Sequence, residues 1–362
     1  MLRASVFGAI VLAATAGAGQ RVTPNAPTDI RRAESPRSAP RILVMYDFEG
    51  ASGVANGRMM DREHPGDFAK GRGSLVSDVA TVVAALFEGG ASAVDVLNTH
   101  GDLDPTLVPA ARLDKRVRVR TRQEMNSLAP YHPDVARALA GQYDAIVAIG
   151  MHTKPLTGGF SPHTMGAGLS PVIGNAAVTE TELVGYSFGT IGVPVIMASG
   201  DDVLQRDLAI AMPWVEYVVV KRSSGPDAAE PLPAEQVRSE LRRGASRALA
   251  GLDRMRPMRI TAPVRAGLLA TFPMVLPPGL KNGGLPGISG SGDTVVFTAP
   301  DYRAAWVGIR VLMTIAAGNG AMRSIGFLQS RPGAREALRE LADSTNAEWT
   351  AFEIRAIKSR VP

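Results

Sequence analysis

The sequence predicts an α/β fold, with a mostly parallel sheet covered by helices on both faces and a second, smaller α+β unit. Short runs of consecutive Val, Ile and Leu alternate with longer helix-like runs, which is typical of parallel strands buried on both faces. Polar side chains gather at the carboxyl ends of the short runs, where α/β sheets bind ligands. The 362-residue chain also exceeds the length of about 250–300 residues at which one core stops growing, so two domains are expected.

The first domain is expected to begin at Arg41, where the apolar run RILV opens a strand. Further strands are expected wherever a short apolar run recurs, and helices where a longer run separates two of them. The predicted strands are 41–50, 93–101, 117–121, 143–152 and 193–202, and the predicted helices are 73–88, 134–142 and 180–192.

A second unit is expected to follow the proline-containing segment 222–233, which has the composition of a boundary. Its predicted elements are a helix at 234–252, strands at 258–263 and 293–300, and a helix at 301–318, with one more amphipathic helix at 333–344. The predicted domains are therefore 41–225, the α/β metal-binding catalytic domain; 226–320, the second α+β domain; and 321–362, a C-terminal helical extension.

The amino terminus has the three parts of a secretory signal peptide, namely Arg3, an apolar stretch of about a dozen residues, and small residues at Ala16 and Ala18. The stretch is shorter than the roughly 20 residues that span a bilayer, and no later segment is expected to span one. We therefore predict a signal peptide at 1–18, a flexible polar leader at 19–40, and a secreted or periplasmic protein that is free of the membrane after cleavage.

Composition narrows the possible partners. The formal net charge is +5, but the basic residues are scattered and are not interleaved with aromatic residues, so nucleic acid is not an expected partner. The chain has no cysteine, so a metal site would have to use His, Asp and Glu, which suit zinc and similar divalent ions.

Two carboxylates, Asp47 and Glu49, end the first predicted strand. Alternate residues of a strand share a face, so the two charges are expected to lie side by side, which raises their pKa values unless a cation lies between them. His100 and His152 end two other predicted strands at the same edge. Two imidazoles and two carboxylates are enough to hold two zinc-like ions about 3.5–4 Å apart, which would lower the pKa of a shared water and polarise a carbonyl group.

The remaining histidines lie in loops. His163 lies in the glycine-rich segment LTGGFSPHTMGAG, whereas His64 and His132 neighbour prolines in polar segments and are expected to be surface residues.

At these positions the sequence resembles the zinc-dependent D-aminopeptidases, the M55 peptidase family. The likeness runs from about residue 41 to 317. It rests on motifs in the family's order, which stand here as DFEGASG at 47–53, LNTHG at 97–101, IGMH at 149–152, GFSPHT at 159–164 and VPVIMASGDD at 193–202. LNTHG is one residue shorter than the family's motif and lacks its Asp, and Pro162 directly precedes His163. Both departures lie beside the site and bear on substrate preference.

The resemblance implies site residues, a cofactor and an assembly. It implies the metal ligands Asp47, Glu49, His100, His152 and Glu180, with Asp47 as the bridge; Glu180 is placed by counting 13 residues back from Val193, and Glu182 is close enough to be confused with it. His163 corresponds to the catalytic histidine, which would donate a proton to the leaving amine or stabilise the intermediate. The family implies two zinc ions per subunit, with cobalt or manganese possible, a short peptide substrate that can carry an N-terminal D-residue, and a homo-oligomeric ring such as a decamer.

Features of the sequence also bear on two other functions. The segment GYSFG at 185–189 matches the nucleophile elbow of serine hydrolases, but the residues before it read as helix and all five histidines precede Ser187, against the order of that family. The alternative that stays open is a non-catalytic exported metal-binding or cell-envelope recognition protein on the same fold, which would share every ligand but would not need His163.

Overall fold

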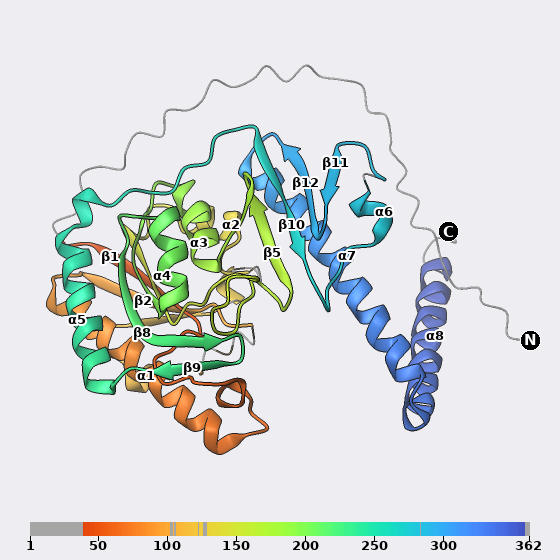
Figure 1. The fold of residues 1–362 in the computed structure, drawn as a ribbon, viewed down its shortest axis with the longest axis horizontal. Helices are drawn as coiled ribbons and strands as arrows, with labels where there is room; N and C mark the ends of the chain where they lie inside the picture. The colour runs from red at the N-terminus through yellow and green to blue at the C-terminus, as the bar shows by residue number, and fades with distance from the viewer. Residues whose placement is uncertain are drawn as a thin grey trace, which may run out of the picture. The chain divides into compact units, whose positions relative to one another are not determined.

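The computed structural model describes residues 39–358 apart from 102, 103, 105, 122, 126–128 and 283. The predicted signal peptide and residues 19–38 of the leader lie outside the described residues. Two sheets organise the described chain, one of seven strands and one of five (Figure 1). The predicted α/β class, a mostly parallel sheet with helices and a second smaller unit, is confirmed.

The larger sheet has the strand order β3-β2-β1-β4-β7-β8-β9, and all neighbours are parallel except β8 and β9. The order places the carboxyl ends of β1, β2 and β4 next to one another. The strands are β1 (Arg41–Tyr46), β2 (Ala93–Asn98), β3 (Arg118–Arg120), β4 (Ala145–Ile149), β7 (Val195–Asp201), β8 (Glu216–Gly225) and β9 (Ala228–Pro231).

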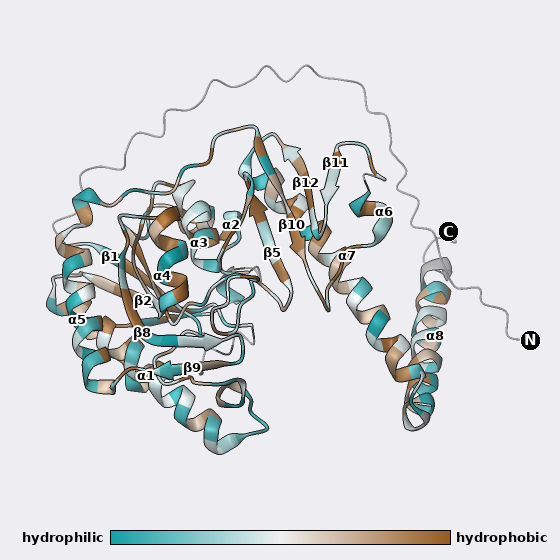
Figure 2. Cartoon of the chain, in the orientation of Figure 1, coloured by the Kyte–Doolittle hydropathy of each residue, from teal (hydrophilic) through white to brown (hydrophobic). Residues whose placement is uncertain are grey.

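Helices cover both faces of this sheet because its central strands are apolar on both sides. In β1, Ile42 and Val44 pack with α1 (Pro65–Glu88) and α5 (Ala234–Ala250). Leu43 and Met45 point the other way and belong to a second core. The helices of that core on this sheet are α2 (Pro133–Ala138), α3 (Glu180–Gly189) and α4 (Asp202–Ala211). In Figure 2, the first part of β8 is coloured as hydrophobic and the part toward its arrowhead is teal to white, whereas α5 alternates between hydrophilic and hydrophobic residues.

The smaller sheet is antiparallel and has the order β11-β12-β10-β5-β6. Its strands are β5 (Leu169–Ile173), β6 (Ala176–Ala177), β10 (Val264–Ala270), β11 (Ile288–Ser291) and β12 (Thr294–Ala299). The helices in this part of the chain are α6 (Pro278–Lys281), α7 (Tyr302–Gln329) and α8 (Arg335–Lys358). Short 3₁₀ turns complete the described elements at Gly57–Met60, Ala110–Arg112, Gln123–Met125, Leu252–Arg254 and Pro332–Ala334.

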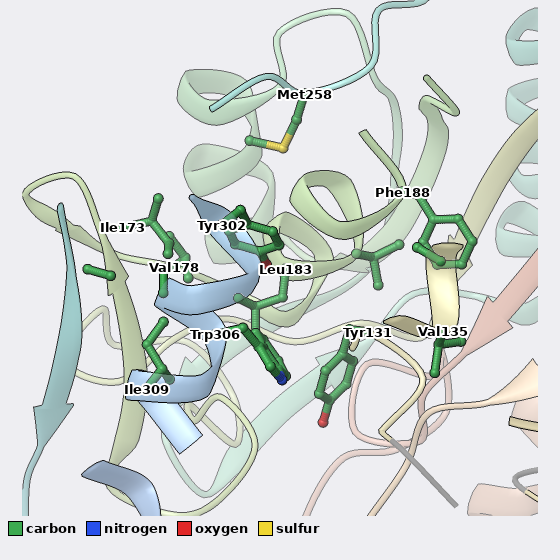
Figure 3. Close-up of a cluster of buried hydrophobic side chains, with 14 of the residues drawn as sticks. Tyr131, Val135, Ile173, Val178, Leu183, Phe188, Met258, Tyr302, Trp306 and Ile309 are labelled. Atoms are coloured by element: carbon green, nitrogen blue, oxygen red, sulfur yellow. The ribbon is translucent and has the colours of Figure 1, made fainter. Parts of the chain in front are cut away.

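The helix α7 packs on the smaller sheet and buries Trp306 and Ile309 in the core shared with β10 and α3 (Figure 3). Among the described helices, α7 alone has the length and the apolar composition needed to cross a membrane. Within the protein, 22% of its most apolar window is buried. The expectation that no later segment meets this criterion was therefore wrong. Core helices of soluble proteins pass the same test.

Several element boundaries differ from the sequence prediction. The strand predicted at 258–263 was wrong, because pairing starts at Val264, after a proline that has no N–H to donate. α1 begins eight residues before the predicted start, with Pro65 at its first position. The helix signal before residue 73 is weak because Gly66 and Gly71 are poor helix formers.

The two sheets are interleaved along the sequence. β5 and β6 lie between β4 and β7 of the larger sheet in the sequence, yet β5 pairs with β10 of the smaller sheet. α7 likewise runs through residue 320 without a break. The domain boundaries at 225 and 320 stay predictions.

Candidate metal centre

The site lies where three neighbouring strands of the larger sheet end. β1, β2 and β4 are followed within three residues by Asp47, His100 and His152. The backbone continues the strand pairing just past β1, because Asp47 N–H donates to Ile149 O at 2.8 Å and Thr99 N–H donates to Tyr46 O at 2.9 Å. The parallel register therefore brings these three side chains together.

Asp47 and Glu49 meet at the site in a different way from the prediction. β1 ends at Tyr46, so the alternation of a strand does not place them; a turn over 48–50 does. The turn packs closely against the chain after β4, where a Cβ on Gly50 would lie 1.9 Å from the Met151 carbonyl oxygen. Only glycine fits there, and the turn brings both carboxylates to His100.

The side chains predicted as ligands approach one another within a few ångströms. His100 Nδ1 lies 3.2 Å from Asp47 Oδ1 and 3.0 Å from Glu49 Oε2. His152 Nε2 lies 3.4 Å from Asp47 Oδ2 and 3.9 Å from Glu180 Oε1. The five side chains are nearly or largely buried, and Asp47 faces one histidine with each of its oxygens.

Three sets of donor atoms could each hold an ion. They are Asp47, Glu49 and His100; Asp47, His152 and Glu180; and Glu49, His152 and His163, with the atoms of each set within 4.8 Å of one another. Asp47 belongs to the first two sets, which is the placement expected of a bridging carboxylate. Carboxylate oxygen and imidazole nitrogen are ligands that zinc and similar divalent ions accept.

The orientation of His152 tests whether these residues fit a metal. Its Nδ1–H donates to the Thr153 carbonyl oxygen at 3.1 Å, which leaves Nε2 directed at the carboxylates. Nε2 is buried and has no hydrogen-bond partner among the described residues. Metal-bound histidines are typically held in this way by their second nitrogen. The residues therefore fit a bound metal ion.

Burial and charge work against each other in this cluster. Burial alone would raise the pKa of Asp47, but the neighbouring rings of His100 and His152 hold it well below its ordinary value. Burial would lower the histidine pKa values, yet the neighbouring carboxylates raise them to about 11 for His100 and about 10 for His152. Burial and the charge of Asp47 raise the pKa of Glu180 to about 8. The acids crowd together and bind positive charge strongly.

The start of α3 separates the roles of Glu180 and Glu182. Thr179 is the N-cap, and its hydroxyl accepts a hydrogen bond from Glu182 N–H while the Glu182 carboxylate accepts one from Thr179 N–H at 2.7 Å. This capping box occupies Glu182. Glu180 points into the cluster instead, where Met165 N–H donates to its Oε1 at 2.6 Å.

Glu180→Gln is expected to weaken metal binding by at least about 10-fold, the smallest loss typical of removing even an outer partner of a metal site. Glu182→Gln is the matched control. Glutamine can still complete the capping box, so the metal content and melting temperature of this variant should stay near those of the parent. Metal titration of the two purified variants checks the assignment, and weaker binding in Glu182→Gln alone would reverse it.

His163 lies beside the cluster in the loop before β5. Its ring stacks on His152 with centroids 4.1 Å apart, and its Nε2 lies 3.8 Å from Glu49 Oε1. Nδ1–H donates to the Ser161 carbonyl oxygen at 2.9 Å, so Nε2 is the nitrogen that faces the cluster. Burial and the charge of His152 lower the pKa of His163. The predicted surface histidines, His64 and His132, are part-buried. His132 caps α2 by accepting a hydrogen bond from Asp134 N–H, whereas His64 precedes α1 and bonds to Asp61 without capping the helix.

Asp201 and Lys221 hold the loops of the site. Asp201 accepts hydrogen bonds from Val203 N–H and Leu204 N–H through Oδ1, and from Phe160 N–H at 2.9 Å through Oδ2, so it ties the His163 loop to the start of α4. The fully buried Lys221 ammonium donates to the carbonyl oxygens of Glu49 and Val54 and lies 4.2 Å from the Phe160 ring centroid.

Sequence reasoning missed Lys221 because it did not predict β8, on which this residue lies. The signal available was a lysine that directly follows the apolar run YVVV. Burial lowers the pKa of Lys221 to about 7, although the negative charges of nearby carboxylates act to raise it.

The segment GYSFG lies inside α3, and the Ser187 hydroxyl donates to the Tyr131 carbonyl oxygen at 2.6 Å. Ser187 is fully buried in a helix and does not form a nucleophile elbow.

Comparison with known proteins agrees with this geometry. The Peptidase M55 family, described as D-aminopeptidase, matches residues 41–306. A D-aminopeptidase of Bacillus subtilis (strain 168) is 23% identical over 233 residues, which cover 64% of this chain and 81% of that protein. The solved structure of the Zn-dependent D-aminopeptidase DppA from Bacillus subtilis, described as a self-compartmentalizing protease, superposes with a TM-score of 0.63 at 21% identity over 76% of this chain and 98% of that one. The chain therefore belongs to the Peptidase M55 family of D-aminopeptidases.

Proposed function

We propose that the protein is an exported aminopeptidase that uses two metal ions to hydrolyse short peptides, including peptides with an N-terminal D-residue. The observation that carries the proposal is the position of Asp47, whose two oxygens face His100 and His152 in two overlapping sets of donor atoms. Family membership supports peptidase activity, and the zinc dependence of the structural relative makes zinc the first metal to test. Cobalt and manganese suit the same ligands.

Different residues of the site would bind the metal ions and transfer the proton. Asp47, Glu49, His100, His152 and Glu180 would hold the ions, which supply a polarised carbonyl and a water of lowered pKa when bound.

His163 Nε2, aimed at the cluster by the Nδ1–H bond to Ser161, is placed to give a proton to the leaving amine. Because its pKa is lowered, the ring is mostly neutral near pH 7 and takes up a proton only when the reaction supplies one.

Export and assembly rest on separate supports. The signal-like residues 1–18 support secretion or delivery to the periplasm, and amino-terminal sequencing of the exported protein tests the cleavage point. The structural relative is described as self-compartmentalizing, which supports a homo-oligomeric ring here, and light scattering of the mature protein tests it.

Chelation is expected to abolish cleavage of D-Ala and L-Ala peptides, and added zinc is expected to restore it. The raised pKa values of His100 and His152 mean that both rings hold protons once the ion is removed, so zinc must displace protons. At one zinc concentration, binding should therefore be tighter at about pH 8 than at about pH 6. Metal analysis and a peptide panel check this, with a serine-hydrolase inhibitor as the control that should have no effect. Full activity in protein that metal analysis finds empty would contradict the proposal.

A further inference from the structure

A cavity of about 640 Å³ opens beside the metal cluster. Thr99 and Gly101, on either side of His100, line one part of it, and Met165, whose N–H bonds to Glu180, lines another. The helix α7 forms the far wall. The volume of the cavity lies within the range of small-molecule sites, about 300–1,000 Å³. The proposed ligands do not line the cavity themselves, but neighbours of His100 and a hydrogen-bond partner of Glu180 do.

Most of the cavity wall is apolar. Trp306 is fully buried beneath it and packs edge-on against Tyr131 with ring centroids 6.2 Å apart (Figure 3). Val307 and Val311, one and five residues further along α7, line the same cavity and are more than half exposed. These surfaces suit the side chains of a short peptide.

Arg310 is the one lining residue that carries a permanent positive charge. Its guanidinium reaches only the Met313 sulfur, at 4.0 Å, and no carboxylate of the described residues lies within 4.0 Å of it. Arg303, two turns earlier on α7, is instead paired with Asp134 at 2.7 Å. A guanidinium group that has no carboxylate partner within the protein can form a bidentate ion pair with a carboxylate of a ligand.

The cavity extends from the surroundings of the metal cluster to Arg310. Residues next to the ligands line one part of it, and Arg310 lies on the α7 side. The pKa of Tyr131, which also lines the cavity, responds to both groups: burial raises it, the charges of Glu180 and Asp47 raise it further, and the charge of Arg310 lowers it. A short peptide whose scissile bond lies at the cluster would direct its terminal carboxylate toward Arg310.

We propose that Arg310 binds the free terminal carboxylate of the substrate, so that this cavity selects short zwitterionic peptides over peptides whose carboxyl end is blocked or continues. The inference rests on the proposed aminopeptidase function and adds a residue that determines its specificity. The scissile bond of the peptide would lie at the metal cluster, and the apolar wall of α7 would contact the side chain next to the carboxyl end.

The test compares a D-Ala dipeptide as the free acid with the same dipeptide as its C-terminal amide. The parent enzyme should favour the acid by about 10–100-fold in kcat/KM, the range that a hydrogen bond to a charged group supplies. Arg310→Gln should lose this preference mainly through a higher KM for the acid. Turnover of the amide, which has no terminal carboxylate, should stay near the parent value. Arg310→Lys should recover part of the preference.

Arg323→Gln is the matched control, since Arg323 lies on the same helix outside the cavity, near the Phe272 ring. It should keep the full preference for the acid. Equal cleavage of acid and amide by the parent, or an equal loss of both in Arg310→Gln, would overturn the proposal. Absence of cleavage of either substrate by the metal-loaded parent would instead contradict the aminopeptidase function itself, so the two failures are distinguishable.

Discussion

Replacing His163 by alanine is expected to lower kcat by about 10²–10⁴-fold, the usual contribution of a general acid or base. The bound metal should remain. Nε2 faces Glu49 at 3.8 Å, and the lowered pKa of His163 leaves the ring mostly neutral near pH 7, so that it can take up a proton during the reaction. Single-turnover kinetics and metal analysis of the same preparation measure the two effects separately.

The metal analysis decides between two roles, because His163 also belongs to a set of donor atoms with Glu49 and His152. Loss of metal together with activity would make His163 a ligand. His64→Ala is the control, since His64 bonds to Asp61 in an unrelated loop at 2.9 Å. That variant should keep both metal and activity.

Asp47→Asn is expected to remove both metal and activity, with a fall of about 10³-fold or more, because bound metal contributes several kcal/mol of transition-state stabilisation. Asp47 offers one oxygen to each of the two histidines, and the amide nitrogen of asparagine cannot replace an anionic oxygen. Metal content and kcat/KM are the measurements.

Asp114→Asn is a matched control for Asp47→Asn, since Asp114 forms a surface pair with Arg116. It should change neither measurement. Retention of two equivalents of metal by Asp47→Asn would contradict the shared-ligand role. Circular dichroism of both variants separates loss of metal from loss of fold.

The convergence of the site could be predicted because it depends on local patterns. Asp47, His100 and His152 follow continuous apolar runs, and parallel strands place their carboxyl ends at one edge. That argument needs no exact register. It gave the correct neighbourhood for Asp47 and Glu49 even though a turn, not a strand, sets their direction.

The rest depended on contacts between distant parts of the chain. β5 has a proline at Pro171 and is paired with β10 almost a hundred residues later, so its own sequence carries a weak strand signal. Spacing placed Glu180 but left Glu182 as a near alternative, because the capping box that occupies Glu182 appears only once the helix start is known. Lys221 acts on Glu49 from 172 residues away. Such partners are matters of tertiary structure.

The pairing of β5 with β10 has a consequence for dissecting this enzyme. His163 precedes β5 and Glu180 follows β6, so two members of the site sit at either end of a hairpin whose outer neighbour comes from the carboxyl-terminal half. A fragment ending near residue 225 would keep every residue predicted to bind metal, yet it would lose the strand that anchors that hairpin. The shortest active fragment of the chain is therefore expected to be longer than the segment that contains the predicted metal ligands and His163.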